Sequence, residues 1–247
     1  MLTIAFLVGS LFAIKRAKKY EIPAHEVVRI VNVIIITSLV GSRILGIIEN
    51  FPKYSKDPKQ IFYFWQGDFS YHGGLILAFI SVFWWAKRKN ISFGCILDAF
   101  TPSIALGSCF VRIGCFLNGC CFGNSTNMPW GIVFPFNSPA GYIYQGVKIH
   151  PTQVYESLAG LASLFVLLFI EKVFQPTDRN GRLFYYFLIL TAISRFIVEF
   201  FRYQNPNLSK LGFLTETQVF CVIFLILSLF IIYMKKTKII TTFSDAL

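Results

Sequence analysis

Residues 27–48 read VVRIVNVIIITSLVGSRILGII, a long apolar stretch with few charged or polar interruptions. A helix needs about 20 predominantly apolar residues to cross the hydrocarbon core of a bilayer. A helix buried in the core of a soluble domain rarely carries apolar residues on every face over that length. The stretch therefore predicts a helix that spans a membrane.

Similar apolar stretches recur along the rest of the chain. Its 247 residues are 55% hydrophobic and 14% charged, with a mean hydropathy of +0.61, too little polar surface for a soluble domain of this size. We expect an all-α, polytopic membrane helix bundle of about seven transmembrane helices, at residues 1–14, 27–48, 69–86, 91–118, 156–174, 183–201 and 214–234. No Pro-, Gly- or Ser-rich linker separates two apolar halves, which favours a single integral-membrane domain over 1–247.

The longest segment between the predicted spans, at about 119–151, is rich in Gly, Pro and Asn. We expect it to form a small, compact extracytoplasmic loop region. The first predicted span has only about 14 apolar residues, short of the usual length. Its basic residues follow the apolar run rather than precede it, unlike a signal peptide, so we expect a start codon assigned too late or a missing first half of this span.

The net charge of +11 is spread in short basic groups between apolar stretches. The groups follow the first, third, fifth and seventh predicted spans: Lys15, Arg16, Lys18 and Lys19; Lys87, Arg88 and Lys89; Lys172, Arg179 and Arg182; Lys235, Lys236 and Lys238. Cytoplasmic loops of membrane proteins are enriched in Lys and Arg. We therefore expect the N-terminus outside and the C-terminus in the cytoplasm, and no nucleic acid as a partner, because no basic groove with interleaved aromatics is present.

Several ionisable residues lie within the predicted spans or at their edges. Each costs about 2.5–3.5 kcal/mol to insert, so such residues normally face a bundle interior or a water-filled cavity. They are Arg43, His72, Arg112, Arg195 and Glu199, and the segment 150–156, with the sequence HPTQVYE, adds further polar groups. By the predicted topology all of them lie toward the outer face. Five separate segments thus deliver polar groups to one level, which favours a functional site over separate packing roles.

The types of these residues indicate what such a site can do. Arg195 and Glu199 are four residues apart and share a helix face that Arg202 continues; they form either a structural ion pair or a phosphate-binding guanidinium oriented by a carboxylate. His72 can cap a loop, or it can transfer a proton near neutral pH. Gly73 and Gly74 after it allow another chain or a ligand to come close.

Five motifs together resemble a known family. They are GSR at 41–43, HGG at 72–74, RIG at 112–114 with Asn118, Gly119 and Gly123, HPTQVYE at 150–156, and SRFIVEFFR at 194–202. In this order and at these spacings they are similar to the prolipoprotein diacylglyceryl transferases, bacterial enzymes of the inner membrane. These enzymes move a diacylglyceryl group from phosphatidylglycerol to the thiol of a lipobox cysteine, forming a thioether and releasing glycerol phosphate.

The resemblance implies a multi-pass protein with its active site toward the outer leaflet, and neither a metal nor an organic cofactor. Its partners would be phosphatidylglycerol, the signal peptides of prolipoproteins with their lipobox cysteine, and membrane lipid. The resemblance further implies site residues. His72 matches the catalytic histidine, Arg112 and Arg195 serve catalysis and bind the phospholipid headgroup, and the other substrate-binding residues are Glu199, Asn118, Gly123 and Arg43.

The cysteines leave other readings open. The chain has six: Cys95, Cys109, Cys115, Cys120, Cys121 and Cys221. Many family members have Asn at the position of Cys115 and an acidic residue at that of Cys120, and the tyrosine of their first span has no counterpart here. A membrane thiol-disulfide oxidoreductase built on Cys115, Cys120 and Cys121 is one alternative, although a C-x-x-C motif is absent. A metal site at these three lacks a spaced His or carboxylate to complete it. A third reading is a lipid or ion transporter that uses the same charged cavity.

The predicted topology can be tested with single cysteine tags in a background without the native cysteines. Tags after Lys89 and after Lys236 should react only once the membrane is permeable, because both follow basic groups. A tag near Asn137 should react with an impermeant thiol reagent in intact cells. If Asn137 and Lys89 were labelled from the same side, the seven-span topology would be wrong.

Overall fold

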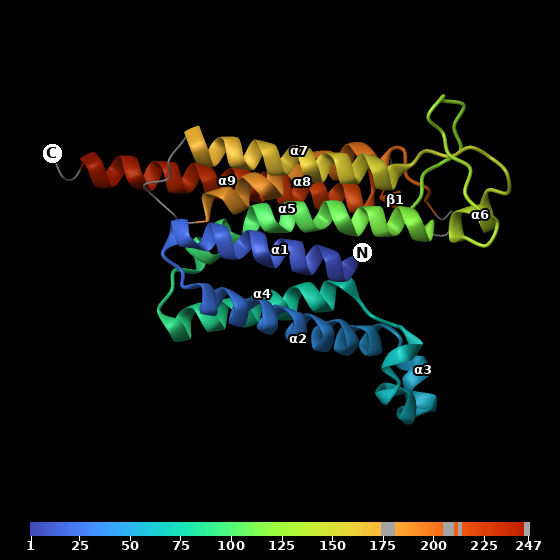
Figure 1. The fold of residues 1–247 in the computed structure, drawn as a ribbon, viewed down its shortest axis with the longest axis horizontal. Coiled ribbons are helices and arrows are strands. Elements are labelled where there is room, and N and C mark those ends of the chain that lie inside the picture. The colour runs from blue at the N-terminus through green and yellow to red at the C-terminus, as the bar shows by residue number, and fades with distance from the viewer. Residues whose placement is uncertain (174–180, 205–209, 212–213, 245–247) are drawn as a thin grey trace. The chain divides into compact units, whose positions relative to one another are not determined.

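A computed structural model of the chain describes residues 1–173, 181–204, 210–211 and 214–244. These residues form mainly long helices (Figure 1). The small sheet among them pairs β1 with β2 in antiparallel fashion. The α-helices and strands are α1 (Leu2–Ala17), α2 (Ala24–Glu49), α3 (Phe51–Lys56), α4 (Tyr71–Lys89), α5 (Phe93–Asn118), α6 (Pro139–Ile143), α7 (Thr152–Val173), α8 (Arg182–Glu199), β1 (Lys210–Leu211), β2 (Leu214–Thr215) and α9 (Glu216–Ser244). Short 3-10 helices cover Lys18–Tyr20, Pro58–Phe62 and Phe64–Gln66. Arg179, one of the predicted cytoplasmic charges, lies outside the described residues.

Four stretches of helix in the described part of the chain are long and apolar enough to cross a membrane. They are α2, α5, α7 and the Glu216–Met234 part of α9. The helices α1, α4 and α8, of 16, 19 and 18 residues, coincide with the other three predicted spans. They do not meet the combined measures of length, hydropathy and charge. The all-α prediction is confirmed, and apolar helices of this length are those of a membrane protein. The number of seven spans stays a prediction.

The long helices expose apolar side chains along their outer faces. Ile36 and Leu39 on α2 are 62% and 58% exposed, and Phe220 and Phe230 on α9 are each 59% exposed. Apolar faces of this extent are unusual on a soluble monomer. In a bilayer they contact lipid chains, while the backbone polar groups are satisfied within the helices. The distribution of side chains therefore agrees with a lipid surround.

The chain divides into two compact units. Unit 1 contains residues 1–12 and 97–247, and unit 2 contains residues 13–96. The expectation of a single integral-membrane domain over 1–247 stays a prediction.

In unit 2, glycines bring α2 and α4 into close contact. A Cβ added at Gly41 would collide with the carbonyl group of Gly73, and one added at Gly73 would collide with the carbonyl group of Gly41. A Cβ at Gly74 would lie 2.9 Å from the carbonyl oxygen of Ser38. Small residues let two membrane helices approach backbone to backbone. Gly73 and Gly74 are buried, and the close approach that they permit is that of another helix of the same chain, α2.

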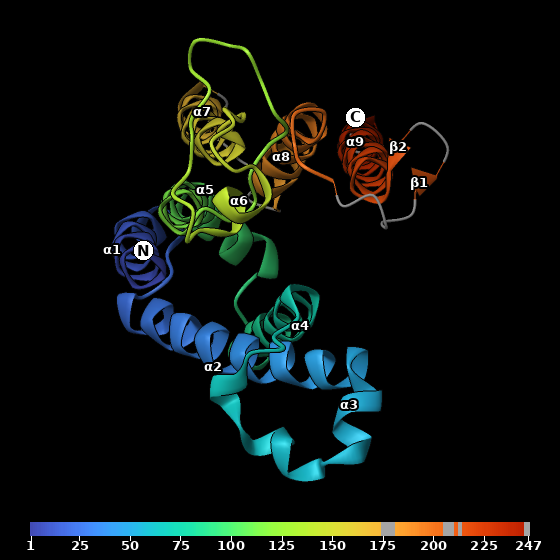
Figure 2. The same cartoon turned by 90° about the vertical axis from the view of Figure 1, so that its right-hand side faces the viewer.

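In unit 1, α8 lies between α7 and α9, as the end-on view of Figure 2 shows. The core between α5, α7 and α8 is formed by Ala105, Leu164, Leu167 and Leu183. Asp98 on α5 is 1% exposed and accepts hydrogen bonds from the backbone nitrogens of Gly181, at 3.0 Å, and Phe184, at 3.2 Å. A carboxylate at a helix N-terminus satisfies free backbone donors and the helix dipole. Asp98 therefore fixes the start of α8 against α5.

Residues 119–151 connect α5 to α7 and carry the short helix α6. Isolated backbone bridges join Ser125 to Ile149 and Ile132 to Ile149. Phe122 stacks on Tyr203, which follows α8, with ring centroids 5.2 Å apart. Burial raises the pKa of Tyr144 in the same aromatic group, and the neighbouring Tyr203 raises it further. This segment thus has its own small core and is tied to the end of α8.

The glycine contact between α2 and α4 predicts a difference between two Gly→Ala substitutions. Gly41→Ala should reduce the free energy of unfolding by about 1–3 kcal/mol, because overpacking forces the two backbones apart. Gly107→Ala is the control, since a Cβ there has its nearest neighbour, the Ala5 carbonyl oxygen, at 3.9 Å, and helical Ala is favoured over Gly. Thermal unfolding of the purified protein in detergent measures both. Equal stability of the two variants would contradict the close contact.

Candidate active site

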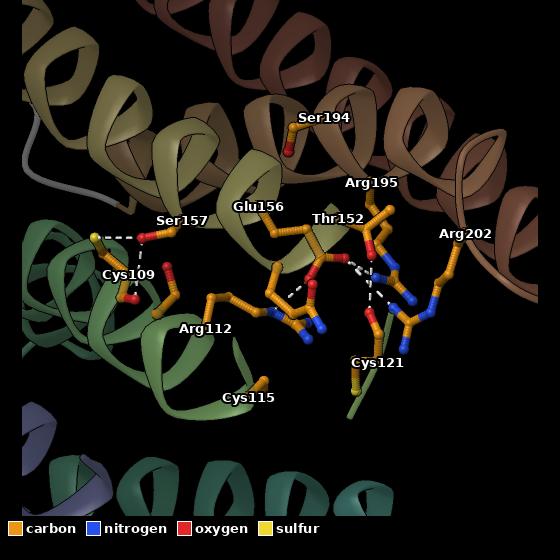
Figure 3. A network of polar contacts seen from close by, with 12 residues as sticks. Cys109, Arg112, Cys115, Cys121, Thr152, Glu156, Ser157, Ser194, Arg195 and Arg202 are labelled. Atoms are coloured by element: carbon orange, nitrogen blue, oxygen red, sulfur yellow. Dashed lines mark hydrogen bonds and ion pairs between the residues drawn. The ribbon is translucent and has the colours of Figure 1, made fainter. Parts of the chain in front are cut away.

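Five charged residues meet where α5 and α8 end and α7 begins. Arg112 comes from α5, Glu156 from α7, Arg195 and Glu199 from α8, and Arg202 from the residues just after α8. We call these five residues the arginine cluster. Figure 3 shows the Glu156 side chain reaching from α7 toward the guanidinium groups of the three arginines.

A single carboxylate is shared by the three arginines. Oε2 of Glu156 lies 2.5 Å from Nε of Arg112. Its Oε1 accepts a hydrogen bond from Nη1 of Arg195 and lies 3.4 Å from Nη1 of Arg202. Charge-assisted contacts of this kind are the strong ones in proteins. Glu156 therefore holds together three segments that are far apart in the sequence.

Glu199 supplies the second carboxylate of the arginine cluster. Its Oε2 lies 3.3 Å from Nη2 of Arg195, one helical turn away. The predicted pair of Arg195 and Glu199 is thus present, but Arg195 also binds Glu156 through its other amino group. Two carboxylates orient this one guanidinium group.

The carboxylates of the arginine cluster are more buried than the arginines. The side chains of Glu156 and Glu199 are 9% and 7% exposed, whereas those of Arg112, Arg195 and Arg202 are 28%, 23% and 19% exposed. Arg112 contacts Glu156 through Nε, and no residue in the described part of the chain accepts from its Nη groups. Three positive groups face two negative ones, so one positive charge is left over. This arrangement suits an anion with oxygen acceptors.

A cavity of about 330 Å³ adjoins the arginine cluster on the side of Arg202 and Glu199. Its lining is mostly polar, and consists of Asn124, Glu199, Phe200, Arg202, Gln204, Thr215 and Gln218. The volume lies at the lower end of the range for small-molecule sites. Of the arginine cluster, Arg202 and Glu199 line this cavity, which has room for a small polar group.

The segment His150–Glu156 positions Glu156 by fixing the loop in front of it. Thr152 and Gln153 are almost fully buried, and they donate hydrogen bonds to the carbonyl oxygens of Cys121 and Cys120 at 2.9 and 2.7 Å. The preceding His150 has its Nδ1 3.0 Å from the hydroxyl of Tyr155. That hydroxyl also accepts from Trp130 at 2.8 Å. The polar residues of this motif are therefore mostly structural, and Glu156 is the one that faces the arginines.

Gly123 lies where three pieces of backbone come together. Its nitrogen donates to the carbonyl oxygen of His150, and it pairs with Arg202 in an isolated bridge. A Cβ at this position would lie 2.6 Å from the carbonyl oxygens of both His150 and Phe201. Only glycine fits there without displacement. Packing of the loop against the end of α8 is thus a sufficient physical reason for this glycine.

Arg43 is buried in unit 2 and binds the segment that follows α2. Its guanidinium group donates to the carbonyl oxygens of Gly67 and Gln60, at 2.6 and 2.8 Å, and of Ile61 and Tyr63, both at 3.2 Å. Rings in the same segment lie within 6 Å of its central carbon, the nearest being that of Tyr54, at 5.4 Å. The structure therefore gives Arg43 a role in shaping residues 57–70. Direct contact with substrate stays a prediction.

Asp68 closes the same segment. It accepts hydrogen bonds from Lys53 at 2.7 Å and from Tyr54 at 2.9 Å. The hydrogen bond from Lys53 lowers the pKa of Asp68, and the one from Tyr54 adds to the effect. Asp68 therefore remains charged, and this pairing anchors residues 57–70 to α3.

The structure places the two other predicted site residues at helix ends. His72 is exposed in the first turn of α4, with its ring edge-on to Tyr71 at 5.7 Å between centroids. Asn118 is the exposed last residue of α5. His72 and Arg43 belong to unit 2, whereas Asn118, Gly123 and the arginine cluster belong to unit 1.

The sequence-based site omitted Glu156 and Arg202, which the structure brings into the arginine cluster. A signal for Glu156 was present, because an unpaired carboxylate at the start of a predicted span is costly. Three arginines near one level also require more than the single carboxylate of Glu199. For Arg202, the signal was its place on the face that Arg195 and Glu199 share.

Comparison with known proteins agrees with the resemblance seen in the motifs. A family model described as prolipoprotein diacylglyceryl transferase matches residues 1–234. The chain belongs to this family. The family assignment made from the five motifs is thereby confirmed.

Similar proteins of the family come from several bacteria. A phosphatidylglycerol–prolipoprotein diacylglyceryl transferase of Clostridium tetani is 31% identical over 238 residues, which cover 96% of this chain and 92% of that protein. Proteins with the same name are 32% identical in Finegoldia magna, covering 85% and 80% of the two chains, and 34% identical in Pseudomonas putida, covering 75% and 67%. The similarity thus extends over nearly the whole chain.

The shared carboxylate predicts that Glu156→Ala destabilises the protein more than Glu199→Ala. Removing Glu156 leaves three guanidinium groups without their common partner, whereas removing Glu199 leaves Arg195 paired with Glu156. The expected loss for Glu156→Ala is on the order of 2 kcal/mol, less than for a fully buried pair because the arginines are partly exposed. Thermal unfolding in detergent measures both. A larger loss for Glu199→Ala would show that Glu156 is not the organising group.

Proposed function

We propose that this protein transfers a diacylglyceryl group from phosphatidylglycerol to the thiol of the lipobox cysteine in a prolipoprotein signal peptide. The products are a thioether-linked lipid and glycerol phosphate. The observation that carries the proposal is the arginine cluster, with its excess positive charge, in a membrane protein of this family. A phospholipid with a phosphodiester headgroup is the anionic substrate that such a cluster suits.

In this reaction, negative charge develops on the phosphate group, where arginine side chains can stabilise it. The thiolate sulfur attacks the glyceryl carbon that carries the phosphate ester, and the bond from that carbon to oxygen breaks. Both electrons of the bond remain on the phosphate, so its negative charge grows as glycerol phosphate leaves. Guanidinium groups held in advance at that position stabilise the developing charge. Arg112, through its open Nη groups, and Arg195 are assigned this role.

The attacking thiol must first lose its proton, because the thiolate is the nucleophile. We assign this step to His72, whose imidazole accepts a proton near neutral pH. The assignment rests on the chemistry of imidazole and on the match of the HGG motif. The exposure of His72 in the first turn of α4 leaves its ring accessible to a substrate.

We further propose a seven-span protein of the bacterial inner membrane, with the N-terminus outside and the C-terminus in the cytoplasm. In unit 1, the arginine cluster lies at one end of the helices, where α5 and α8 end and α7 begins. Lys172 and Arg182 are at the opposite ends of α7 and α8. Basic residues mark the cytoplasmic side. The arginine cluster thus lies at the ends of the helices away from these basic residues, which supports an active site toward the outer leaflet. There a lipid donor and a signal peptide can both enter from the membrane.

The assigned roles predict the ranking of four substitutions. Arg112→Lys and Arg195→Lys keep the charge but lose the two-pronged geometry, so transfer should fall sharply. His72→Gln cannot accept the proton, and the loss should be on the order of a hundredfold or more. Glu199→Gln should reduce transfer less than Arg195→Lys, because Glu199 orients the guanidinium group of Arg195 without touching substrate. Transfer from labelled phosphatidylglycerol to a lipobox peptide in purified membranes measures all four.

The control for these four variants is Arg88→Lys, at the end of α4, where Arg88 lies over the ring of Trp84. It should keep normal activity. All variants should insert into the membrane at the normal level, because each keeps a polar group at its position. Near-normal transfer by both His72→Gln and Arg195→Lys would refute the proposed site.

The alternative of a thiol-disulfide oxidoreductase predicts a different role for the cysteines. All six cysteines lie in the described part of the chain and are free thiols. Replacing Cys120 and Cys121 together with Ser should leave more than about a tenth of the transfer activity, a barrier change below roughly 1.4 kcal/mol. Complete loss of activity in a correctly inserted protein would favour a redox role instead.

A further inference from the structure

Three thiols gather at the end of α5, next to the arginine cluster. The sulfur atoms of Cys115, Cys120 and Cys121 all lie within 4.8 Å of one another. Among the described residues, no His, Asp, Glu or further Cys joins them. All three side chains are half-buried. We call this group the three-thiol cluster.

The backbone turns sharply to bring these side chains together. After the last residue of α5, Gly119 takes a left-handed conformation with a φ of +69°. The nitrogen of Cys120 then donates to the carbonyl oxygen of Cys115 at 3.1 Å. Cys121 is itself left-handed, with a φ of +59°, a conformation that costs a residue with a Cβ on the order of 1 kcal/mol. The turn therefore contains one strained residue, Cys121. It brings the thiols of Cys120 and Cys121 close to the side chain of Cys115.

Contacts outside the sulfur atoms hold this turn in place. The buried amide of Gln153 donates to the carbonyl oxygen of Cys120, and the buried hydroxyl of Thr152 donates to that of Cys121. Figure 3 shows Thr152 pointing from α7 to the Cys121 carbonyl. The side chains of the cluster are thus organised by the backbone before any bond forms between sulfur and a ligand. Such preorganisation is typical of a built binding site.

We propose that the three-thiol cluster binds one thiophilic d10 metal ion, Zn²⁺ or Cu⁺, through three thiolates. Thiolate sulfur lies about 2.3 Å from zinc, which sets the sulfur atoms of one site about 3.8 Å apart. The observed separations need to shrink by at most about 1 Å to reach that geometry. Each thiol gives up its proton as it binds the metal. Cu⁺ is satisfied by three thiolates, whereas Zn²⁺ adds a water as its fourth ligand.

Charge and connectivity favour a metal over the other uses of these thiols. A disulfide joins two sulfurs and leaves the third unexplained, and the adjacent Cys120 and Cys121 are poorly placed to bridge each other. Arg112 lies one helical turn before Cys115, so a positive charge lies near the proposed thiolates. Soft sulfur ligands select thiophilic ions over Mg²⁺ or Ca²⁺. Three mutually close thiols beside a guanidinium group therefore fit a metal best.

A bound ion would tie the end of α5 to the segment that leads to Gly123. That segment pairs with Arg202 of the arginine cluster, so the metal would stabilise the frame of the cluster without touching its charged groups. The inference does not depend on the proposed transfer activity. Metal binding and lipid transfer are measured separately, and either can fail alone.

The test uses the full chain, purified in detergent under reducing conditions and stripped of metal with a chelator. Equal samples are equilibrated with Zn²⁺ or with Cu⁺ in the presence of a weak competing chelator, and bound metal is measured by elemental analysis. One of the two ions should bind at one per chain and protect three of the six thiols from maleimide. Cys115→Ser and Cys121→Ser should each weaken binding at least about 100-fold. Cys95→Ser, also on α5 but outside the cluster, is the matched control and should bind normally.

A second measurement keeps the test informative if a variant folds poorly. The metal-bound wild type should unfold at a higher temperature than the stripped protein, because the ion binds only the folded state. Failure of both ions to reach about a tenth of an equivalent in wild type would overturn the proposal. So would full binding by the Cys115→Ser/Cys120→Ser/Cys121→Ser variant. Conversion of two cluster thiols to a disulfide in the stripped wild type, without metal uptake, would also overturn it and assign the thiols to redox chemistry.

Discussion

The buried carboxylate of Glu156 is the interaction on which this site depends. Three guanidinium groups from α5, α8 and the residues after α8 repel one another, and they can share one place only around a common negative group. Glu156 supplies that group from α7. Breaking such a pairing leaves buried charge without compensation, which is far more costly than never forming it. The position of α7 therefore decides whether the arginines form one site.

The rest of unit 1 holds Glu156 and its partners in register. Asp98 sets the start of α8 against α5, so Arg195 arrives at the level of Arg112. Thr152 and Gln153 fasten the loop after α5 to the first turn of α7, one turn before Glu156. In each of these contacts, a polar group is paired within apolar surroundings, where an unpaired polar group would cost free energy. Stability and preorganisation for an anionic substrate thus come from the same contacts.

Much of this could be predicted from the sequence because lipid imposes simple rules. Long apolar stretches predict helices, and the four-residue spacing of Arg195 and Glu199 predicts that the two side chains pair, which the structure shows. The sequence does not show which carboxylate pairs with an arginine, because side chains from different helices meet only in the fold. The role of Glu156 was missed for this reason. The same holds for Arg43, whose partners are backbone carbonyls, and for Gly73, whose neighbour is another helix.

If the arginine cluster binds the phosphate of an anionic phospholipid, a lipid-binding measurement shows this without any chemical step. Purified protein would be incubated with an equimolar mixture of phosphatidylglycerol and phosphatidylcholine, and the retained lipid counted by native mass spectrometry. Wild type should hold one phosphatidylglycerol tightly, and Arg112→Lys and Arg195→Lys should each lose this preference. Equal retention of the two lipids by wild type, or an unchanged preference in both variants, would contradict it.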